Sequence, residues 1–247
     1  MAAMTRSERF AVQDMLWDKA GLEPVEQVPG NRGLALALTS CGVLIGRLNR
    51  AMELAGLTLV TIEDVERCIR AVASQKPDVV FLDERITAGS PEFRRKLRQA
   101  RVTETLPILP ILLKETLSVS IGSKSPESEI FMKTRALLRR ERPFALRGKR
   151  HSGAFVLDES RFKLYFADRV ADLNKTELCL LGPFFDMVDV VLGRQTLEQL
   201  ALPEGGRKVG SRTVDFQVSR MRRRVKAQLG VDPFRAVRGI GYALARV

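Results

Sequence analysis

The clearest pattern of apolar and polar positions lies near the C-terminus of the chain. An apolar stripe at helical spacing consists of Val214, Val218, Met221, Val225 and Leu229. On a helix with about 3.6 residues per turn, the opposite side carries Phe216 and mainly polar and basic residues. We therefore predict an amphipathic helix over residues 211–229, capped by Ser211 and ended by Gly230, with one face for a protein core and one for a partner.

A short basic hairpin is predicted to follow this helix. Gly239 and Gly241 flank Ile240 and permit a tight turn, because glycine adopts backbone conformations that other residues avoid. Tyr242 offers a ring that can pack beneath the turn. The Gly-Ile-Gly run superficially resembles a dinucleotide-binding loop, but no room remains for the helix that such a loop needs.

The middle of the chain alternates between short apolar strands and helices. Strands are predicted over residues 34–38, 57–61, 77–83 and 106–113, and helices over residues 45–55, 65–75, 93–101 and 126–140. The last helix is marked by Pro126 and two acidic residues at its start and by arginines at its end. The alternation favours an α/β domain over residues 33–140, with a parallel sheet covered by helices on both faces.

Three other segments complete the expected domain organisation. Residues 1–32 carry one helix over residues 10–20, which could pack on the α/β domain or serve as a dimerisation arm. Residues 141–153 are polar and basic and are predicted to be an interdomain linker. Residues 154–247 are expected to form a second domain that contains the basic helix and the hairpin.

Composition adds a strong positive charge to this picture. The 247 residues carry a formal net charge of +12 and have a pI near 10.2, which favours a polyanionic partner. A membrane surface would attract the same charge, but no apolar run approaches the roughly 18 residues of a spanning helix, and no signal-peptide core is visible. Three cysteines, Cys41, Cys68 and Cys179, fit buried or free thiols in a reducing cytoplasm. We therefore expect a cytoplasmic protein with no membrane partner.

Arginine dominates the polar side of the C-terminal helix. A guanidinium can grip a phosphate or bind a guanine edge through two hydrogen bonds, so this face suits duplex DNA. The alternative is a solvated charged surface, as most charge runs are. Acidic neighbours are few, with Asp215 inside the helix and Asp232 beyond it, and this scarcity favours contact with DNA.

The C-terminal domain resembles the winged-helix effector domain of OmpR/PhoB-type response regulators. The matched opening strand, two helices, recognition helix and wing lie at residues 155–158, 173–181, 190–197, 211–229 and 236–242. Asn174 is expected to cap the first of these helices in a capping box with Glu177. The resemblance implies a homodimer on double-stranded DNA, and it places the loop over residues 202–209 where the family approaches RNA polymerase.

The resemblance also implies which residues contact DNA. Recognition-helix positions that touch DNA in the family are matched by Arg212, Thr213, Phe216, Gln217, Arg220 and Arg222. Arg223 joins them from the polar side of the helix, and Arg238 matches the wing arginine that enters the minor groove. Ala236 stands where the family usually has threonine. Phe216 replaces a common valine and could either pack on a thymine methyl group or belong to the core.

Residues 33–140 resemble a receiver domain, and Asp83 matches its phosphorylated aspartate. A receiver holds Mg²⁺ with an acidic pair, but Thr39 and Ser40 stand at those positions. We therefore expect a pseudo-receiver without a metal or other cofactor, in which Asp83 is a leftover carboxylate at a strand end. The alternative keeps Asp83 as a phosphate acceptor.

Other receiver positions depart from the pattern as well. Leu112 takes the place of the switch hydroxyl, and no aromatic partner is evident near Val119. The stretch between Leu113 and Lys124 is shorter than a receiver normally has. The expected fold is thus a flavodoxin-like, receiver-like α/β domain with a shortened fourth helix, joined to an α+β winged helix-turn-helix domain.

An enzyme is the main alternative class of protein. The single histidine, His151, lies in the predicted linker, which disfavours histidine-dependent triads and His-rich metal sites, and no Walker-type loop is present. We predict a sequence-specific DNA-binding transcription regulator without catalytic activity that works independently of phosphorylation. The alternatives are a conventional response regulator activated through Asp83 and a nonspecific nucleoid or nucleic-acid-binding protein.

Overall fold

The computed structural model describes residues 33–87, 95, 106–111, 126–201 and 212–245. Within the chain, residues 32–247 form one compact unit. The predicted N-terminal helix, the shortened fourth helix and the polymerase-facing loop lie outside the described residues, as does nearly all of the helix expected over residues 93–101. None of the described helices combines the length and the apolar character needed to cross a bilayer.

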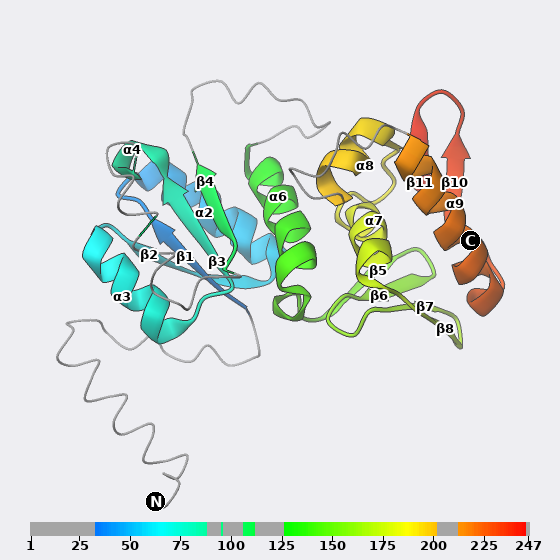
Figure 1. The fold of residues 1–247 in the computed structure, drawn as a ribbon, viewed down its shortest axis with the longest axis horizontal. Helices are drawn as coiled ribbons and strands as arrows, with labels where there is room; N and C mark the ends of the chain where they lie inside the picture. The colour runs from blue at the N-terminus through cyan, green and yellow to red at the C-terminus, as the bar shows by residue number, and fades with distance from the viewer. Residues whose placement is uncertain (1–32, 88–94, 96–105, 112–125, 202–211, 246–247) are drawn as a thin grey trace, which may run out of the picture. The chain divides into compact units, whose positions relative to one another are not determined.

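The first half of the compact unit is built around a four-stranded parallel sheet. Its strands are β1 (Gly33–Leu38), β2 (Leu57–Ile62), β3 (Val79–Asp83) and β4 (Ile108–Ile111). They lie in the order β2-β1-β3-β4 (Figure 1), the order of the first four strands in flavodoxin-like folds. The carboxyl ends of β1 and β3 therefore meet at one edge of the sheet.

Helices cover both faces of this sheet, as the sequence predicted. Helices α2 (Gly42–Ala55) and α6 (Pro126–Glu141) share one apolar cluster with the sheet, and α3 (Val65–Gln75) shares another. Successive residues of a strand point to opposite faces, so Ala35 belongs to the first cluster and Leu36 to the second. The central strands β1 and β3 of this receiver-like arrangement are thus buried on both sides.

The second half opens with a four-stranded antiparallel sheet. Its strands are β5 (Lys149–Ser152), β6 (Phe155–Asp158), β7 (Lys163–Phe166) and β8 (Arg169–Asp172), which pair in chain order. The predicted linker over residues 141–153 therefore contains a strand, and the 3₁₀ turn η1 (Pro143–Ala145) precedes it. The basic sequence of β5 concealed it, because an edge strand can be polar and still pair through its backbone.

Three helices and a hairpin complete the second half. The remaining elements are α7 (Lys175–Asp186), β9 (Leu192–Gly193), α8 (Arg194–Ala201), α9 (Arg212–Leu229), β10 (Phe234–Val237) and β11 (Gly241–Leu244). The second helix begins later than the matched segment over residues 190–197, because β9 pairs with β11 instead. Strands β10, β11 and β9 form a three-stranded sheet that carries the wing.

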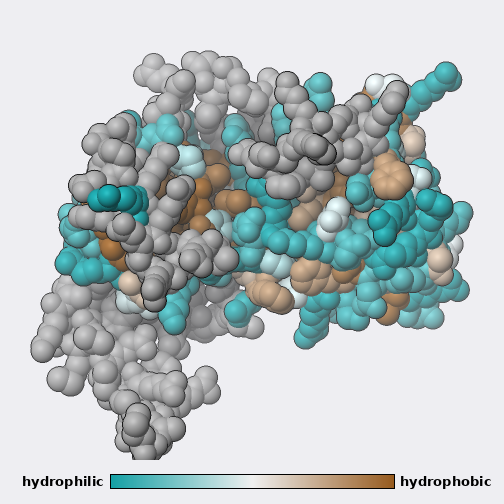
Figure 2. Space-filling model, in the orientation of Figure 1, coloured by the Kyte–Doolittle hydropathy of each residue, from teal (hydrophilic) through white to brown (hydrophobic). Residues whose placement is uncertain are grey.

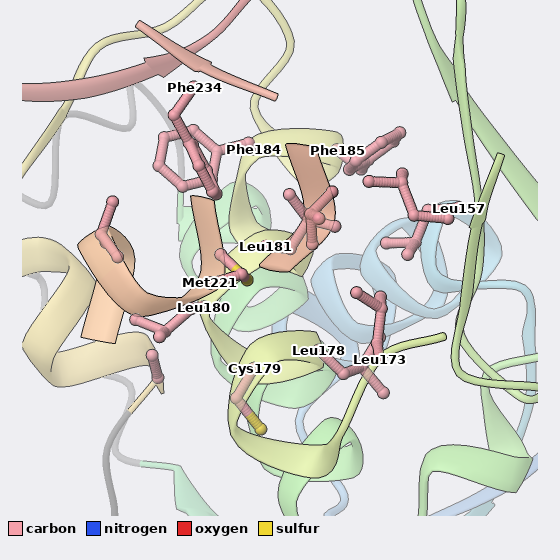
Figure 3. Packing of buried hydrophobic residues seen from close by; sticks show 14 of the residues in the cluster. Leu157, Leu173, Leu178, Cys179, Leu180, Leu181, Phe184, Phe185, Met221 and Phe234 are labelled. Atoms are coloured by element: carbon pink, nitrogen blue, oxygen red, sulfur yellow. The ribbon is translucent and has the colours of Figure 1, made fainter. Parts of the chain in front are cut away.

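One apolar core joins these elements (Figure 3). The predicted stripe on α9 is entirely buried, so the amphipathic reading of this helix is confirmed. The rings of Phe184 on α7 and Phe234 on β10 meet edge to face, with 5.2 Å between their centroids. Because α9 packs on α7 and the wing is anchored to the same core, the outward face of α9 and the wing are held in fixed relation.

The N-terminus of α7 carries the predicted capping box. The side-chain oxygen of Asn174 accepts a hydrogen bond from the backbone N–H of Glu177 at 2.9 Å. The carboxylate of Glu177 accepts one from the backbone N–H of Asn174 at 2.8 Å. Both bonds satisfy backbone donors that the first helical turn leaves without partners.

Candidate DNA-binding site

The polar face of α9 lies on the surface, opposite the buried stripe. Arg220 and Arg223 are exposed, and Gln217 is half-buried. Phe216 is 61% exposed, so the alternative that placed this residue in the core is wrong. Arg212 and Thr213 occupy the first turn of α9, although their side chains lie outside the described residues.

The wing extends the same basic surface. Arg238 is exposed at the turn between β10 and β11, beside Gly239 with a φ of 76°. Gly241 cannot be replaced without strain, because a Cβ there would lie 2.0 Å from the carbonyl oxygen of Leu192. Ile240 is exposed at the tip. The turn therefore presents one guanidinium and one apolar side chain to a partner.

Among the described residues, two carboxylates beside this surface, Asp215 and Asp232, are bound within the domain. Asp215 accepts hydrogen bonds from Arg194 Nε at 2.9 Å and from the hydroxyl of Tyr242 at 2.6 Å. These contacts link α9, α8 and the wing. Burial, and then the bond to Asp215, raise the pKa of Tyr242, so its hydroxyl remains a donor at neutral pH.

Asp232, the second carboxylate, holds Arg222. The Nε atom of Arg222 donates to Asp232 Oδ2 at 2.8 Å, and the backbone N–H of Phe234 donates to Asp232 Oδ1 at 3.0 Å. The hydrogen bond between Arg222 and Asp232 raises the pKa of Arg222 and holds its guanidinium near the start of the wing. Arg222 is half-buried, whereas the family resemblance had implied only a contact with DNA.

Arg224 supports the helix from behind. Its Nε donates to Glu177 Oε1 at 2.8 Å, and its Nη2 also contacts Glu177 and the carbonyl of Asp172. The capping box of α7 thereby also anchors α9. Sequence reasoning missed this role, although the strong capping signal at Glu177 marked the residue to which Arg224 would bind.

Arg220, Arg223 and Arg238 differ from these supporting arginines. In the described part of the chain, no ion pair or hydrogen bond engages any of the three. Figure 2 shows hydrophilic residues over much of the winged-helix half in this view. An exposed set of unpaired guanidiniums on a helix and a neighbouring turn has the chemistry to bind phosphates and base edges.

The phosphoacceptor candidate lies in the first half, at the carboxyl end of β3. Asp83 is 2% exposed and accepts a hydrogen bond from Thr39 Oγ1 at 2.8 Å. Arg85, on the single helical turn α4 (Glu84–Thr87), donates to the same carboxylate through Nε at 2.9 Å and Nη2 at 2.6 Å. Thr39, which the receiver resemblance placed at an acidic-pair position, thus binds Asp83, and the sequence did not reveal the role of Arg85.

The receiver resemblance implies Mg²⁺ at this edge, and the residues present do not fit it. Mg²⁺ prefers a near-octahedral set of oxygens that includes carboxylates, whereas Thr39 supplies a hydroxyl where a second carboxylate is needed. Arg85 already provides a positive charge to Asp83, and its hydrogen bond holds the pKa of Asp83 below the usual value. Among the described residues, no group of three or more side chains could hold a metal ion.

Cys41 borders this cluster at the N-terminus of α2. Its backbone N–H donates to Thr39 Oγ1 at 3.1 Å. A hydrogen bond from Arg85 and others from backbone N–H groups of α2 lower the pKa of the Cys41 thiol. Arg85 therefore acts on both Asp83 and Cys41.

Comparison with known proteins places this geometry in context. The phosphate regulon transcriptional regulatory protein PhoB of Pseudomonas aeruginosa is 26% identical over 206 residues, which cover 78% of this chain and 88% of that protein. PhoB of Rhizobium meliloti is 28% identical over 207 residues, covering 78% of this chain and 90% of the relative. Over most of its length, the chain is thus similar to response regulators of the PhoB type. No protein-family model matches it.

A solved structure of the DNA-binding domain of response regulator AdeR, in complex with an intercistronic region, is 24% identical. It covers 40% of this chain and 99% of that domain, with a TM-score of 0.34. The relationship to OmpR/PhoB-type regulators rests instead on the PhoB proteins, whose alignments span both halves of the chain. These relatives are named as regulators of transcription and not as enzymes.

Proposed function

We propose that this chain is a sequence-specific, DNA-binding regulator of transcription that acts in the cytoplasm and has no catalytic activity. The observation that carries the proposal is the surface formed by α9 and the wing. Arg220, Arg223 and Arg238 are exposed there without ion pairs in the described residues, while both nearby carboxylates are bound to structural partners. The family relationship supports the same function.

In this proposal α9 enters a major groove and the wing reaches the flanking minor groove. Arg220 and Arg223 contact phosphates or guanine edges, and Phe216 packs against a thymine methyl group. Arg238 enters the minor groove, where guanidiniums are attracted by the negative potential. Arg212, Thr213 and Gln217 complete the contacts, and we assign Arg222 mainly to holding the wing through Asp232.

We further propose that a homodimer binds two half-sites about one helical turn apart. Such an arrangement repeats the same contacts on each half-site and raises both affinity and specificity. The loop over residues 202–209 remains a candidate contact for RNA polymerase.

Regulation in this proposal does not depend on phosphorylation. Asp83 is buried and is held by Thr39 and Arg85, and Thr39 and Ser40 stand where a receiver carries the carboxylates that recruit Mg²⁺. In this proposal no metal neutralises the incoming phosphoryl oxygens, and the guanidinium of Arg85 is already engaged by the Asp83 carboxylate, so phosphoryl transfer to Asp83 is disfavoured.

The test is selection of duplexes from a random DNA library by the full-length, unphosphorylated protein. The expected result is enrichment of two half-sites separated by about one turn. Binding of duplexes without enrichment of any sequence would instead identify a nonspecific nucleic-acid-binding protein. The affinity of such a protein would fall steeply with salt on every sequence.

A further inference from the structure

The receiver-like half and the winged-helix half meet through buried charges. Arg135 and Arg139 of α6 bind Glu159, in the turn after β6, and Asp186, at the end of α7. Exposure of the four side chains is between 1% and 3%. We call these four residues the interdomain clamp.

The geometry of the clamp is reciprocal. Arg135 Nε lies 2.7 Å from Asp186 Oδ1, and Arg139 Nη2 lies 2.7 Å from Asp186 Oδ2. Arg139 Nε donates to Glu159 Oε1 at 2.5 Å, and Arg135 Nη2 contacts the other oxygen of Glu159. Each arginine therefore binds both carboxylates, and each carboxylate binds both arginines.

Apolar contacts supply the attraction that the charges alone do not. Burying ion pairs costs about as much desolvation free energy as their attraction returns, so such pairs give specificity more than stability. Leu200 of α8 is buried in the cluster that contains α2 and α6, and Met187 packs against that cluster. The apolar contacts hold the halves together, and the clamp selects one relative position because any other would leave buried charges unpaired.

Gly182 shows how closely the two halves approach. A Cβ on this residue of α7 would lie 2.1 Å from Arg139 Nε, and the three nearest atoms all belong to Arg139. A glycine in the interior of a helix lowers the stability of the helix. Gly182 in α7 therefore indicates that close packing on Arg139 outweighs this loss of helix stability.

We propose that the two halves form one cooperative folding unit, locked by the interdomain clamp, and that this closed state is the one that binds DNA. The residues of the α9 and wing surface are exposed while the clamp is engaged, so docking does not cover them. The face of α6 that carries Arg135 and Arg139 is buried against the winged-helix half of the same chain. A dimer on DNA would therefore form through other surfaces. The statement about DNA rests on the proposed function, whereas the statement about folding does not.

The test compares the full-length wild type with Gly182→Ala and with Gly46→Ala as a matched control. Both substitutions add one methyl group inside a helix, but a Cβ on Gly46 meets no atom within 4 Å. Calorimetry should show one unfolding transition for the wild type and for Gly46→Ala. Gly182→Ala should show two transitions, and trypsin should cleave after Arg147 about tenfold faster or more, because undocking loosens the backbone next to Ala145 and Leu146, which are buried in the docked state.

Two results would overturn the folding proposal: two independent transitions in the wild type, or a Gly182→Ala variant that behaves like the control. If Gly182→Ala fails to fold, Glu159→Gln takes its place, since it keeps the side-chain size and removes one charge of the clamp. A single transition and unchanged cleavage in Glu159→Gln would overturn the proposal equally.

Binding of the duplex selected above provides the second readout. Because the closed state is proposed to be the one that binds DNA, the undocked variant should bind this duplex more weakly than the wild type. Equal binding would show that docking is not needed, tighter binding would show that the clamp inhibits the protein, and either result would overturn this part. A single unfolding transition without any sequence-specific binding would leave the clamp standing and refute the proposed function alone.

Discussion

At the scale of single residues, four arginines of α9 divide into two kinds. Arg222 and Arg224 are half-buried and bind carboxylates of their own domain, whereas Arg220 and Arg223 are exposed. The sequence pattern located all four on one helix but could not separate them. The separation depends on Asp232 and Glu177, which lie in other elements and meet the helix only after folding.

Replacing Arg220 by alanine should weaken specific DNA binding by about 1–3 kcal/mol and relax the preference at one base position. The measurement is selection and titration of the variant beside the wild type. Arg222→Ala is the matched control, because it removes the same group from a position bound to Asp232 and should lower folding stability more than base preference. Equal loss on every sequence would make Arg220 a phosphate contact, and no loss would remove it from the interface.

Cys41 should be the most reactive of the three cysteines toward iodoacetamide at neutral pH. Its pKa is lowered by Arg85 and by backbone N–H groups, whereas burial raises the pKa of Cys68 to about 12 and also raises that of Cys179. Mass spectrometry of the alkylated protein over time measures the three rates. Arg85→Ala should slow the reaction of Cys41, and an unchanged rate would contradict the assigned role of Arg85.

At the scale of elements, the sequence predicted most helices and strands of the described residues. Helix α3 was predicted with the bounds observed, Val65–Gln75, because its apolar period and its N-terminal cap agree. Strands β5, β7, β8 and β9 were missed, since each has only two to four residues and exists through pairing with a neighbour. Tertiary pairing, and not local propensity, decides such strands.

The capping box of α7 gives a prediction at this scale. Asn174→Ala removes the acceptor of the Glu177 backbone N–H and should destabilise the protein by about 1 kcal/mol. Unfolding in urea measures the change in the free energy of unfolding. Asn174→Asp keeps a capping acceptor and should restore most of the stability; an equal loss in both variants would show that the cap is not the cause.

At the scale of the whole molecule, the family pattern predicted two halves but not how they are joined. The interdomain clamp connects residues that are distant in sequence, Arg135 and Arg139 with Glu159 and Asp186, and nothing in the local pattern pairs them. The missing Mg²⁺ pair was visible in the sequence at Thr39 and Ser40. The positive charge that Arg85 places beside Asp83 emerged only from the fold.

The folding stability of the protein should fall at acidic pH, because Asp186 of the interdomain clamp becomes protonated. Burial opposes ionisation of Asp186, but Arg139, Arg135 and Arg150 hold its pKa below the usual value of 3.8. A depressed folded-state pKa contributes stability that is present above pH 3.8 and is lost as the pH falls toward the folded-state value. Thermal unfolding between neutral pH and pH 3 or so tests this. Asp186→Asn should flatten the dependence, and an unchanged slope would contradict the role of Asp186.

The most direct test of the account measures the affinity of the full-length protein for its selected duplex and for a scrambled duplex, with and without Mg²⁺ and a small phosphodonor. The account predicts strong preference for the selected duplex, no change on adding the phosphodonor, and no phosphorylation of Asp83. An affinity that rises with the phosphodonor, and loses that rise in Asp83→Asn, would contradict the account and establish a conventional phosphorylated regulator.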